Sequence, residues 1–188
     1  MAWHPEHKQQ SRERILAAAA RLFSHKGFEN TGIDEVMQEA GLTRGGFYSH
    51  FRSKSELYQE ALQFAAMRRF RRALHDPADP ASLVDFERMV EAYLSHEHPQ
   101  AVDGGCPMAF LVTDIAQRDD EVRSAYTQLL SGLLNRLEAA TGNSRATTLQ
   151  QLVLMVGGVA IARAINDDGL RGQLLDACRQ SVLDKQPL

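Results

Sequence analysis

Apolar residues recur along this chain at intervals of three and four positions, which is the spacing of one face of an α-helix. Between positions 15 and 23 they are Ile15, Ala18, Ala19, Leu22 and Phe23. The same spacing returns from Ile33 to Ala40, and Gly41 ends that stretch. No alternation of apolar and polar residues is long enough to indicate a β-strand. The pattern predicts an all-α protein.

Capping residues, glycine and proline divide the pattern into about nine helices. We expect them near residues 7–26, 33–40, 43–51, 53–75, 81–96, 107–117, 120–140, 144–165 and 168–183. Ser53 and Glu56 have the spacing of a capping box. Asp119 is an expected N-cap, Ser144 is expected to start the helix at residues 144–165, and Pro107 fits the first turn of a helix. Residues 76–80 and 97–105 are predicted to be loops.

Two of the short helices are joined by Gly41, Leu42 and Thr43, as in a helix-turn-helix whose second helix enters the major groove of DNA. At about 100° per residue, Phe47 and Phe51 lie on the inner arc of this second helix. The outer arc holds Arg44, Gly45, Tyr48 and Ser49. Arg44 can pair with guanine through its planar guanidinium or contact a phosphate. Gly45 and Gly46 allow a close approach of the backbone, although they could equally form a plain turn.

The same region resembles a known family. Residues 31–36, 40–51, Ser53-Lys54 and Leu57 are similar to the DNA-binding head of TetR/AcrR-family regulators, and the resemblance covers about residues 10–58. It implies a three-helix DNA-binding domain at residues 1–53, followed by a helical ligand-binding and dimerisation body at residues 54–188. The DNA contacts that it implies are Thr31, Thr43, Arg44, Gly45, Gly46, Tyr48, His50 and Lys54. His50 lies toward the inner arc, so a packed histidine is the alternative there.

The resemblance also implies a homodimer built on the last two helices. Independently, the predicted helix at residues 144–165 is apolar on almost every side, which requires that several of its faces be covered. The candidate interface residues are Leu149, Leu152, Val153, Val156, Gly157 and Ala160. Burial inside a single subunit is the alternative.

The middle helices are expected to hold a small-molecule effector. Aromatic and methionine side chains suit an adaptable apolar site, although they could equally be ordinary core. The candidates are Phe64, Met67, Phe86, Met89, Tyr93, Cys106, Met108, Phe110 and Tyr126. Cys106 precedes Pro107 at a helix start, where the dipole favours a thiolate, so it is either a reactive thiol or a packing residue. His96 and His98 lie nearby, but their irregular loop does not predict a metal site, and no cofactor is expected.

Charge and composition narrow the functional class. The net charge is −3, yet residues 1–55 hold eight Lys/Arg against six Asp/Glu, which has the sign of a DNA-facing head. Two cysteines and no membrane-length apolar run favour the cytoplasm. No phosphate-binding loop, nucleophile elbow or zinc-helix motif indicates an enzyme. We expect a repressor released from a pseudo-palindromic operator by an effector. A ligand-free structural DNA-binding protein and a Cys106-dependent enzyme are the alternatives.

Overall fold

The computed structural model describes residues 5–74, 85–101 and 105–184. Within these ranges the chain forms helices and connecting turns and no strand, so the all-α prediction is confirmed. The helices are Pro5–Lys26 (α1), Ile33–Glu39 (α2), Arg44–Ser49 (η1, a 3-10 helix), Lys54–Leu74 (α3), Phe86–Tyr93 (α4), His98–Gln100 (η2, a 3-10 helix), Pro107–Phe110 (α5), Val112–Ile115 (α6), Asp120–Thr141 (α7), Arg145–Ala164 (α8) and Asp168–Leu183 (α9).

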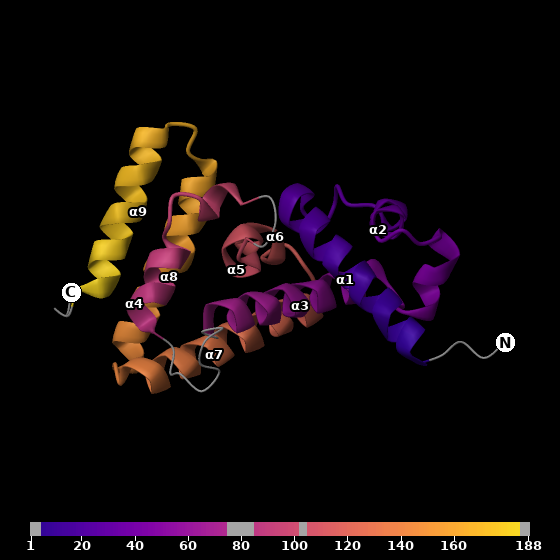
Figure 1. The fold of residues 1–188 in the computed structure, drawn as a ribbon, viewed down its shortest axis with the longest axis horizontal. Coiled ribbons are helices and arrows are strands. Elements are labelled where there is room, and N and C mark those ends of the chain that lie inside the picture. Colours follow the sequence, from indigo (N-terminus) through magenta and orange to yellow (C-terminus); the bar gives the residue numbers. More distant parts are fainter. Residues whose placement is uncertain (1–4, 75–84, 102–104, 185–188) are drawn as a thin grey trace.

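The molecule is elongated (Figure 1). The N-terminal helices α1 and α2 lie at one end, and α8 and α9 lie side by side at the other. The long helices α3 and α7 pack against each other and run between the two ends, with α5 and α6 near the middle. By length and composition, α8 is the one helix of the described chain that could cross a membrane; here it packs against α5, α7 and α9.

The buried apolar residues form two clusters. The first joins α1, α2, η1 and the start of α3, and it also takes in Leu111, Ile115 and Val122 from the following helices. The second joins α4, α5, α7, α8 and α9. Phe110 and Tyr126 pack against both clusters, so the two ends of the molecule share these side chains.

The caps predicted at Asp119 and Ser53 are confirmed, and Ser144 is the N-cap of α8 rather than its first residue. Asp119 accepts a hydrogen bond from the Val122 N–H (3.0 Å), and Ser144 accepts one from the Thr147 N–H (3.2 Å). The Ser53 hydroxyl likewise accepts from the Glu56 N–H (3.0 Å). These bonds satisfy N–H groups that have no partner within their own helix.

The helix predicted at residues 107–117 is divided into α5 and α6. Leu111 leaves helical geometry (φ −116°, ψ 4°) and buries its side chain in the first cluster. After this break, the Asp114 carboxylate accepts hydrogen bonds from the Tyr58 hydroxyl and the Phe28 N–H. Tertiary contacts therefore override the local helix pattern.

The helix predicted at residues 81–96 is shorter than expected. Residues 81–84 lie outside the described chain, and α4 starts after its N-cap Asp85 and ends at Tyr93. Its last carbonyl lies 2.5 Å from His98 Nδ1, while His98 Nε2 accepts a hydrogen bond from the Cys106 N–H (3.1 Å). A neutral His98 that donates from Nδ1 satisfies both contacts, so its ring caps α4 and fixes the turn that follows.

Candidate DNA-binding site

The segment after α2 starts with a tight turn. Gly41 has a positive φ (65°), a conformation that favours glycine, and Thr43 then provides the extended N-cap of η1. Hydrogen bonds from Gly46 N–H to Thr43 O (3.0 Å) and from His50 N–H to Phe47 O (2.9 Å) span three residues. The segment that the sequence predicts as a helix is therefore a tight 3-10 turn. Two adjacent glycines explain this, because each lowers α-helix stability by about 1 kcal/mol relative to alanine.

Two phenylalanines anchor this segment. Phe47 and Phe51 are 0% and 1% exposed, and their ring centroids lie 5.8 Å apart. The Arg12 guanidinium of α1 lies 4.4 Å from the Phe51 ring centroid and donates to the His50 carbonyl (2.5 Å) and to Glu60 of α3 (2.5 Å). The backbone of the segment is thus fixed to both α1 and α3.

The opposite side of the segment faces solvent. Tyr48 is 67% exposed, and the Arg44 side chain is 68% exposed. A Cβ atom at Gly45 would meet no described atom within 4 Å, so this part of the backbone is open to an approaching molecule. Gly46 instead backs onto α2, where a Cβ would lie 3.6 Å from Met37 Cε. Thr43, Arg44, Gly45 and Tyr48 are all exposed to solvent.

Thr31 does not belong to this surface. Its side chain is 0% exposed, and its hydroxyl donates to the Gly27 carbonyl (2.8 Å) at the end of α1. The expectation that Thr31 contacts DNA is wrong for this conformation, because its hydroxyl closes the turn between α1 and α2.

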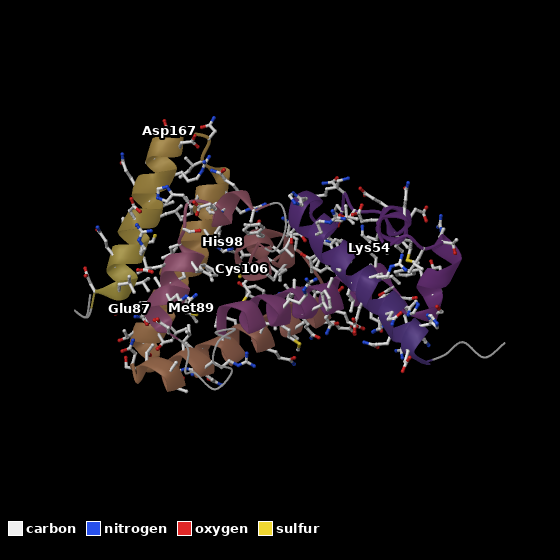
Figure 2. All side chains as sticks on the ribbon, viewed as in Figure 1. Lys54, Glu87, Met89, His98, Cys106 and Asp167 are labelled. Carbon is white, nitrogen blue, oxygen red and sulfur yellow. The ribbon has the colours of Figure 1, made fainter. Side chains whose placement is uncertain are left out.

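Lys54 lies at the start of α3, where head and body meet (Figure 2). Its Nζ lies 4.3 Å from the centroid of the Phe28 ring and donates to the Glu29 carbonyl (3.4 Å). Burial lowers the pKa of the Lys54 ammonium group below its ordinary value. Arg118, which follows α6, lies 4.6 Å from the same ring centroid and pairs with Glu29 (2.6 Å). Lys54, which is expected to contact DNA, therefore shares its aromatic partner with Arg118 of the body.

Asp114 and Tyr58 complete this junction. The Tyr58 hydroxyl donates to Asp114 Oδ2 (2.5 Å), and burial together with this bond raises the pKa of Tyr58 above its ordinary range. The Tyr58 ring, 0% exposed, also packs edge-on against Phe23 (4.7 Å between centroids). Sequence reasoning missed this junction, since its partners are separated by 56 positions and no local pattern pairs them.

Known proteins share this arrangement. The family described as "Bacterial regulatory proteins, tetR family" matches residues 15–61, which run from α1 through η1 into α3. The transcriptional repressor BepR of Brucella suis biovar 1 is 29% identical over 163 residues, which cover 79% of this chain and 78% of BepR. YfiR of Bacillus subtilis strain 168, an HTH-type transcriptional regulator, is 29% identical over 121 residues, which cover 52% of this chain and only 59% of YfiR.

The similarity in fold extends over nearly the whole chain. A TetR transcriptional regulator from Chloroflexus aurantiacus superposes with a TM-score of 0.71 at 23% sequence identity, covering 94% of this chain and 96% of that one. The chain carries a DNA-binding region of the tetR family of bacterial regulatory proteins at residues 15–61, and its whole fold is that of TetR regulators. It is a helix-turn-helix DNA-binding protein, and this family is a class of regulators rather than enzymes. The alternative of a Cys106-dependent enzyme is therefore not supported.

In the body of this TetR-family regulator, the residues predicted to bind an effector do not all pack in one cluster. Met89, Tyr93, Cys106 and Met108 belong to the second cluster or pack against it, as does Phe86. Phe110 and Tyr126 join both clusters, whereas Phe64 packs only against the first. Met67 is 54% exposed and lies on the outer side of α3, so its expected place among the lining residues is wrong for this conformation.

His98 is the central side chain that the sequence did not assign to this region. Its ring stacks on Phe110 (5.7 Å between centroids) and meets Tyr93 edge-on (4.7 Å). The Arg163 guanidinium of α8 lies 3.4 Å from the Phe110 ring centroid. Figure 2 shows His98 and Cys106 next to each other near the middle of the molecule, and Met89 on α4. The neighbouring Tyr93 and Phe110 are the sequence signal that could have indicated a packed histidine at this position.

Cys106 is buried (5% exposed), and the helix that it caps is only four residues long. The helix dipole available to its thiol is therefore small. Both ring nitrogens of His98 face backbone groups, and His96 turns instead toward Asp176 of α9 (3.4 Å). The two histidines and Cys106 therefore do not converge on one point where a metal ion could bind.

The candidate dimer residues of α8 lie on different sides of the helix. Leu149 and Val153 are 43% and 68% exposed, and Ile161, which the sequence analysis did not include, is 56% exposed. Val156, Gly157 and Ala160 are partly exposed. Leu152 is only 3% exposed and packs within the second cluster, so it is a core residue of its own subunit.

Proposed function

We propose that this TetR-family regulator is a repressor that binds a pseudo-palindromic operator as a homodimer and leaves it when a small-molecule effector binds the body. The exposure of Arg44 and Tyr48 on a segment anchored by the buried Phe47 is the observation that supports this best. Large exposed side chains on a rigidly held backbone are what reading base edges requires.

Within this proposal, the outward side of η1 contacts base edges. Arg44 pairs with guanine, Tyr48 offers a flat ring and a hydroxyl, and Gly45 allows the backbone to come close. Thr43, Gly46, His50 and Lys54 would hold the phosphate backbone. Lys54 can do so only if it leaves the Phe28 ring, which makes its contact dependent on the position of the body.

The exposed apolar residues of α8 support the dimer. Leu149, Val153 and Ile161, with Leu170 of α9 (54% exposed), are large apolar side chains on two adjacent helices. Where exposed apolar side chains form a contiguous patch, that patch often marks an association site. A two-fold axis through it would place two heads on successive major grooves, about 34–36 Å apart.

The effector region that we propose is centred on Phe110, Tyr126 and their neighbours Met89, Tyr93 and Met108. Phe110 and Tyr126 touch both apolar clusters, so a ligand that displaced them would disturb the head as well as the body. The effector must bind more tightly to the conformation whose heads are misplaced for DNA. A ligand with equal affinity for both conformations would leave their populations unchanged. We divide the chain functionally into residues 1–53, which bind DNA, and residues 54–188, which respond, in a cytoplasmic protein.

Selection of bound duplexes from a random pool, at one stated salt concentration, tests this proposal. We expect a two-fold symmetric preferred site, with Arg44→Ala relaxing the preference at one base pair of each half-site at a cost of about 1–3 kcal/mol. Arg123→Ala removes an exposed arginine of α7, outside the recognition segment, and serves as the matched control. Failure to prefer any duplex over bulk competitor would contradict the proposal.

The same binding assay tests the role of Cys106. If the thiol is a sensor, N-ethylmaleimide should release the wild-type protein from its site and leave Cys106→Ser bound. If Cys106 is a packing residue, the two proteins should respond alike.

A further inference from the structure

Asp34 of α2 contacts the residue that we assign to base reading. Asp34 is the second residue of α2, and Arg44 is the first residue of η1, so their contact bridges the two helices of the helix-turn-helix. Arg44 Nη1 donates to Asp34 Oδ2 at 2.9 Å, with the two side chains 68% and 63% exposed. The ion pair therefore lies on the surface that would face DNA.

The pair leaves one edge of the arginine available. Nη1 lies on the Cδ side of the guanidinium group, whereas Nε and Nη2 form the opposite edge with two parallel N–H groups. In the described part of the chain, no hydrogen bond engages Nε or Nη2 of Arg44. Two parallel N–H groups match O6 and N7 of guanine, the pair of acceptors that arginine most often reads in the major groove.

An unpaired carboxylate would be unfavourable at this position. Asp34 alone would repel phosphates and weaken DNA binding. Paired with Arg44 it is neutralised, and it restricts a long side chain that otherwise has many rotamers. In water such an exposed ion pair contributes little to stability. The attraction between its charges becomes stronger when DNA excludes solvent and lowers the local dielectric constant.

We propose that Asp34 is a positioning residue for base recognition. It holds Arg44 through Nη1 so that the Nε and Nη2 edge points at guanine, and it thereby sets specificity at one base pair of each half-site. This inference rests on the proposed function, and in particular on the assignment of Arg44 as the base reader.

The test compares full-length variants on a set of duplexes, each carrying one base-pair change in the selected site, at one salt concentration. The variants are Asp34→Ala, Asp34→Asn, Arg44→Ala and the double variant Asp34→Ala/Arg44→Ala. Glu35→Gln is the control for lost negative charge, because Glu35 is the next residue of α2 but pairs with Lys26. Melting temperatures of all variants report whether the fold is intact.

We expect Asp34→Ala to lower the guanine preference about 3- to 10-fold, at the same base pair that Arg44→Ala affects. Asp34→Asn should keep part of that preference, since an amide oxygen still accepts from Nη1. The double variant should show the same preference as Arg44→Ala alone, because Asp34 acts through Arg44. Glu35→Gln should leave every preference unchanged. A merely structural role for Asp34 would not single out one base pair.

Two results would overturn the inference while leaving Arg44 in place. If Asp34→Ala tightens binding equally to all duplexes, Asp34 is only a repulsive charge. If it changes preference at another base pair, independently of Arg44, Asp34 reads cytosine N4 itself. If Arg44→Ala weakens all duplexes equally, the assignment of Arg44 and this inference fail together. If the wild type prefers no duplex, the proposed function fails.

Discussion

At the scale of single residues, His50 joins the recognition segment to the interior of the head. It follows η1 as the C-cap, and its Nδ1 is buried with no hydrogen-bond partner among the described residues. Burial lowers the pKa of His50, and the positive charges of Lys8 and Arg12 lower it further. The folded protein therefore favours the neutral imidazole.

We predict that His50 makes the fold less stable as pH falls below about 6.5, the ordinary pKa of histidine. In this range the unfolded chain takes up a proton that the folded protein resists, so the free energy of unfolding decreases with falling pH. Urea unfolding at pH 7.5 and 5.5, at one protein concentration, should show a larger loss for the wild type than for His50→Gln. His7→Gln, at an exposed position of α1, should behave like the wild type. An undiminished loss in His50→Gln would refute the idea.

The sequence predicted the two sides of the recognition segment but not every contact. Phe47, Phe51, Arg44 and Tyr48 could be assigned because position along a short helix determines which way a side chain points. The burial of Thr31 depends on the turn after α1. The position of the Lys54 side chain depends on Arg118, sixty-four positions later in the chain. Local patterns carry no information about a partner as distant as Arg118, whereas the Thr31–Gly27 bond spans only four positions and belongs to a turn that the helix pattern does not describe.

At the scale of helices, two adjacent glycines of α8 face different surroundings. A Cβ at Gly158 would lie 2.9 Å from Cys178 Sγ of α9 and 3.5 Å from Leu94 Cδ2. A Cβ at Gly157 would meet nothing within 4 Å in the described part of the same subunit. Gly158 therefore allows α8 and α9 to approach closely, whereas Gly157 is open toward the outside.

We predict that Gly158→Ala lowers the free energy of unfolding by about 1–3 kcal/mol, because the added methyl group overpacks the contact with α9. Gly157→Ala should instead stabilise an isolated subunit by up to about 1 kcal/mol through its higher helix propensity. Urea unfolding measures both changes, and sedimentation shows whether Gly157→Ala weakens self-association. Equal stability of Gly158→Ala and the wild type would show that α9 can shift without cost.

Most helices could be predicted because periodicity and caps act locally. The ends of α7, α8 and α9 lie within two residues of the expected positions. The break at Leu111 could not be predicted, since the Asp114–Tyr58 bond that accompanies it joins segments 56 positions apart. The early end of α4 could not be predicted either, since the His98 ring that caps Tyr93 from five positions away follows no common capping pattern. In η1 the adjacent Gly45 and Gly46 lower α-helix stability enough that the segment forms a 3-10 helix instead.

At the scale of the whole molecule, the large exposed apolar side chains of the described residues, apart from Tyr48 and Met67, lie on α8 and α9. Val153 is the most exposed of those on α8 (68%), and α8 and α9 form the end of the molecule opposite the head (Figure 1). A subunit that associates through this end leaves its head unobstructed.

We predict that Val153→Glu converts the protein to monomers and reduces operator binding at least tenfold, because it places a charge in an apolar interface and removes the second head. Thr127→Glu adds the same charge on the exposed side of α7 and should leave both properties intact. Analytical ultracentrifugation and a DNA-binding titration measure the two effects. A Val153→Glu dimer with normal operator affinity would place the interface elsewhere.

The first apolar cluster has a practical consequence for engineering. Leu111, Ile115 and Val122 complete the interior of the head although they come from the body. A chimaera that grafts residues 1–53 onto an unrelated regulator would leave this interior partly uncovered, and the Asp114 acceptor for the Phe28 N–H would be missing. Exchanging DNA-sequence specificity among such regulators should therefore succeed more often when the segment around α6 is transferred together with the head.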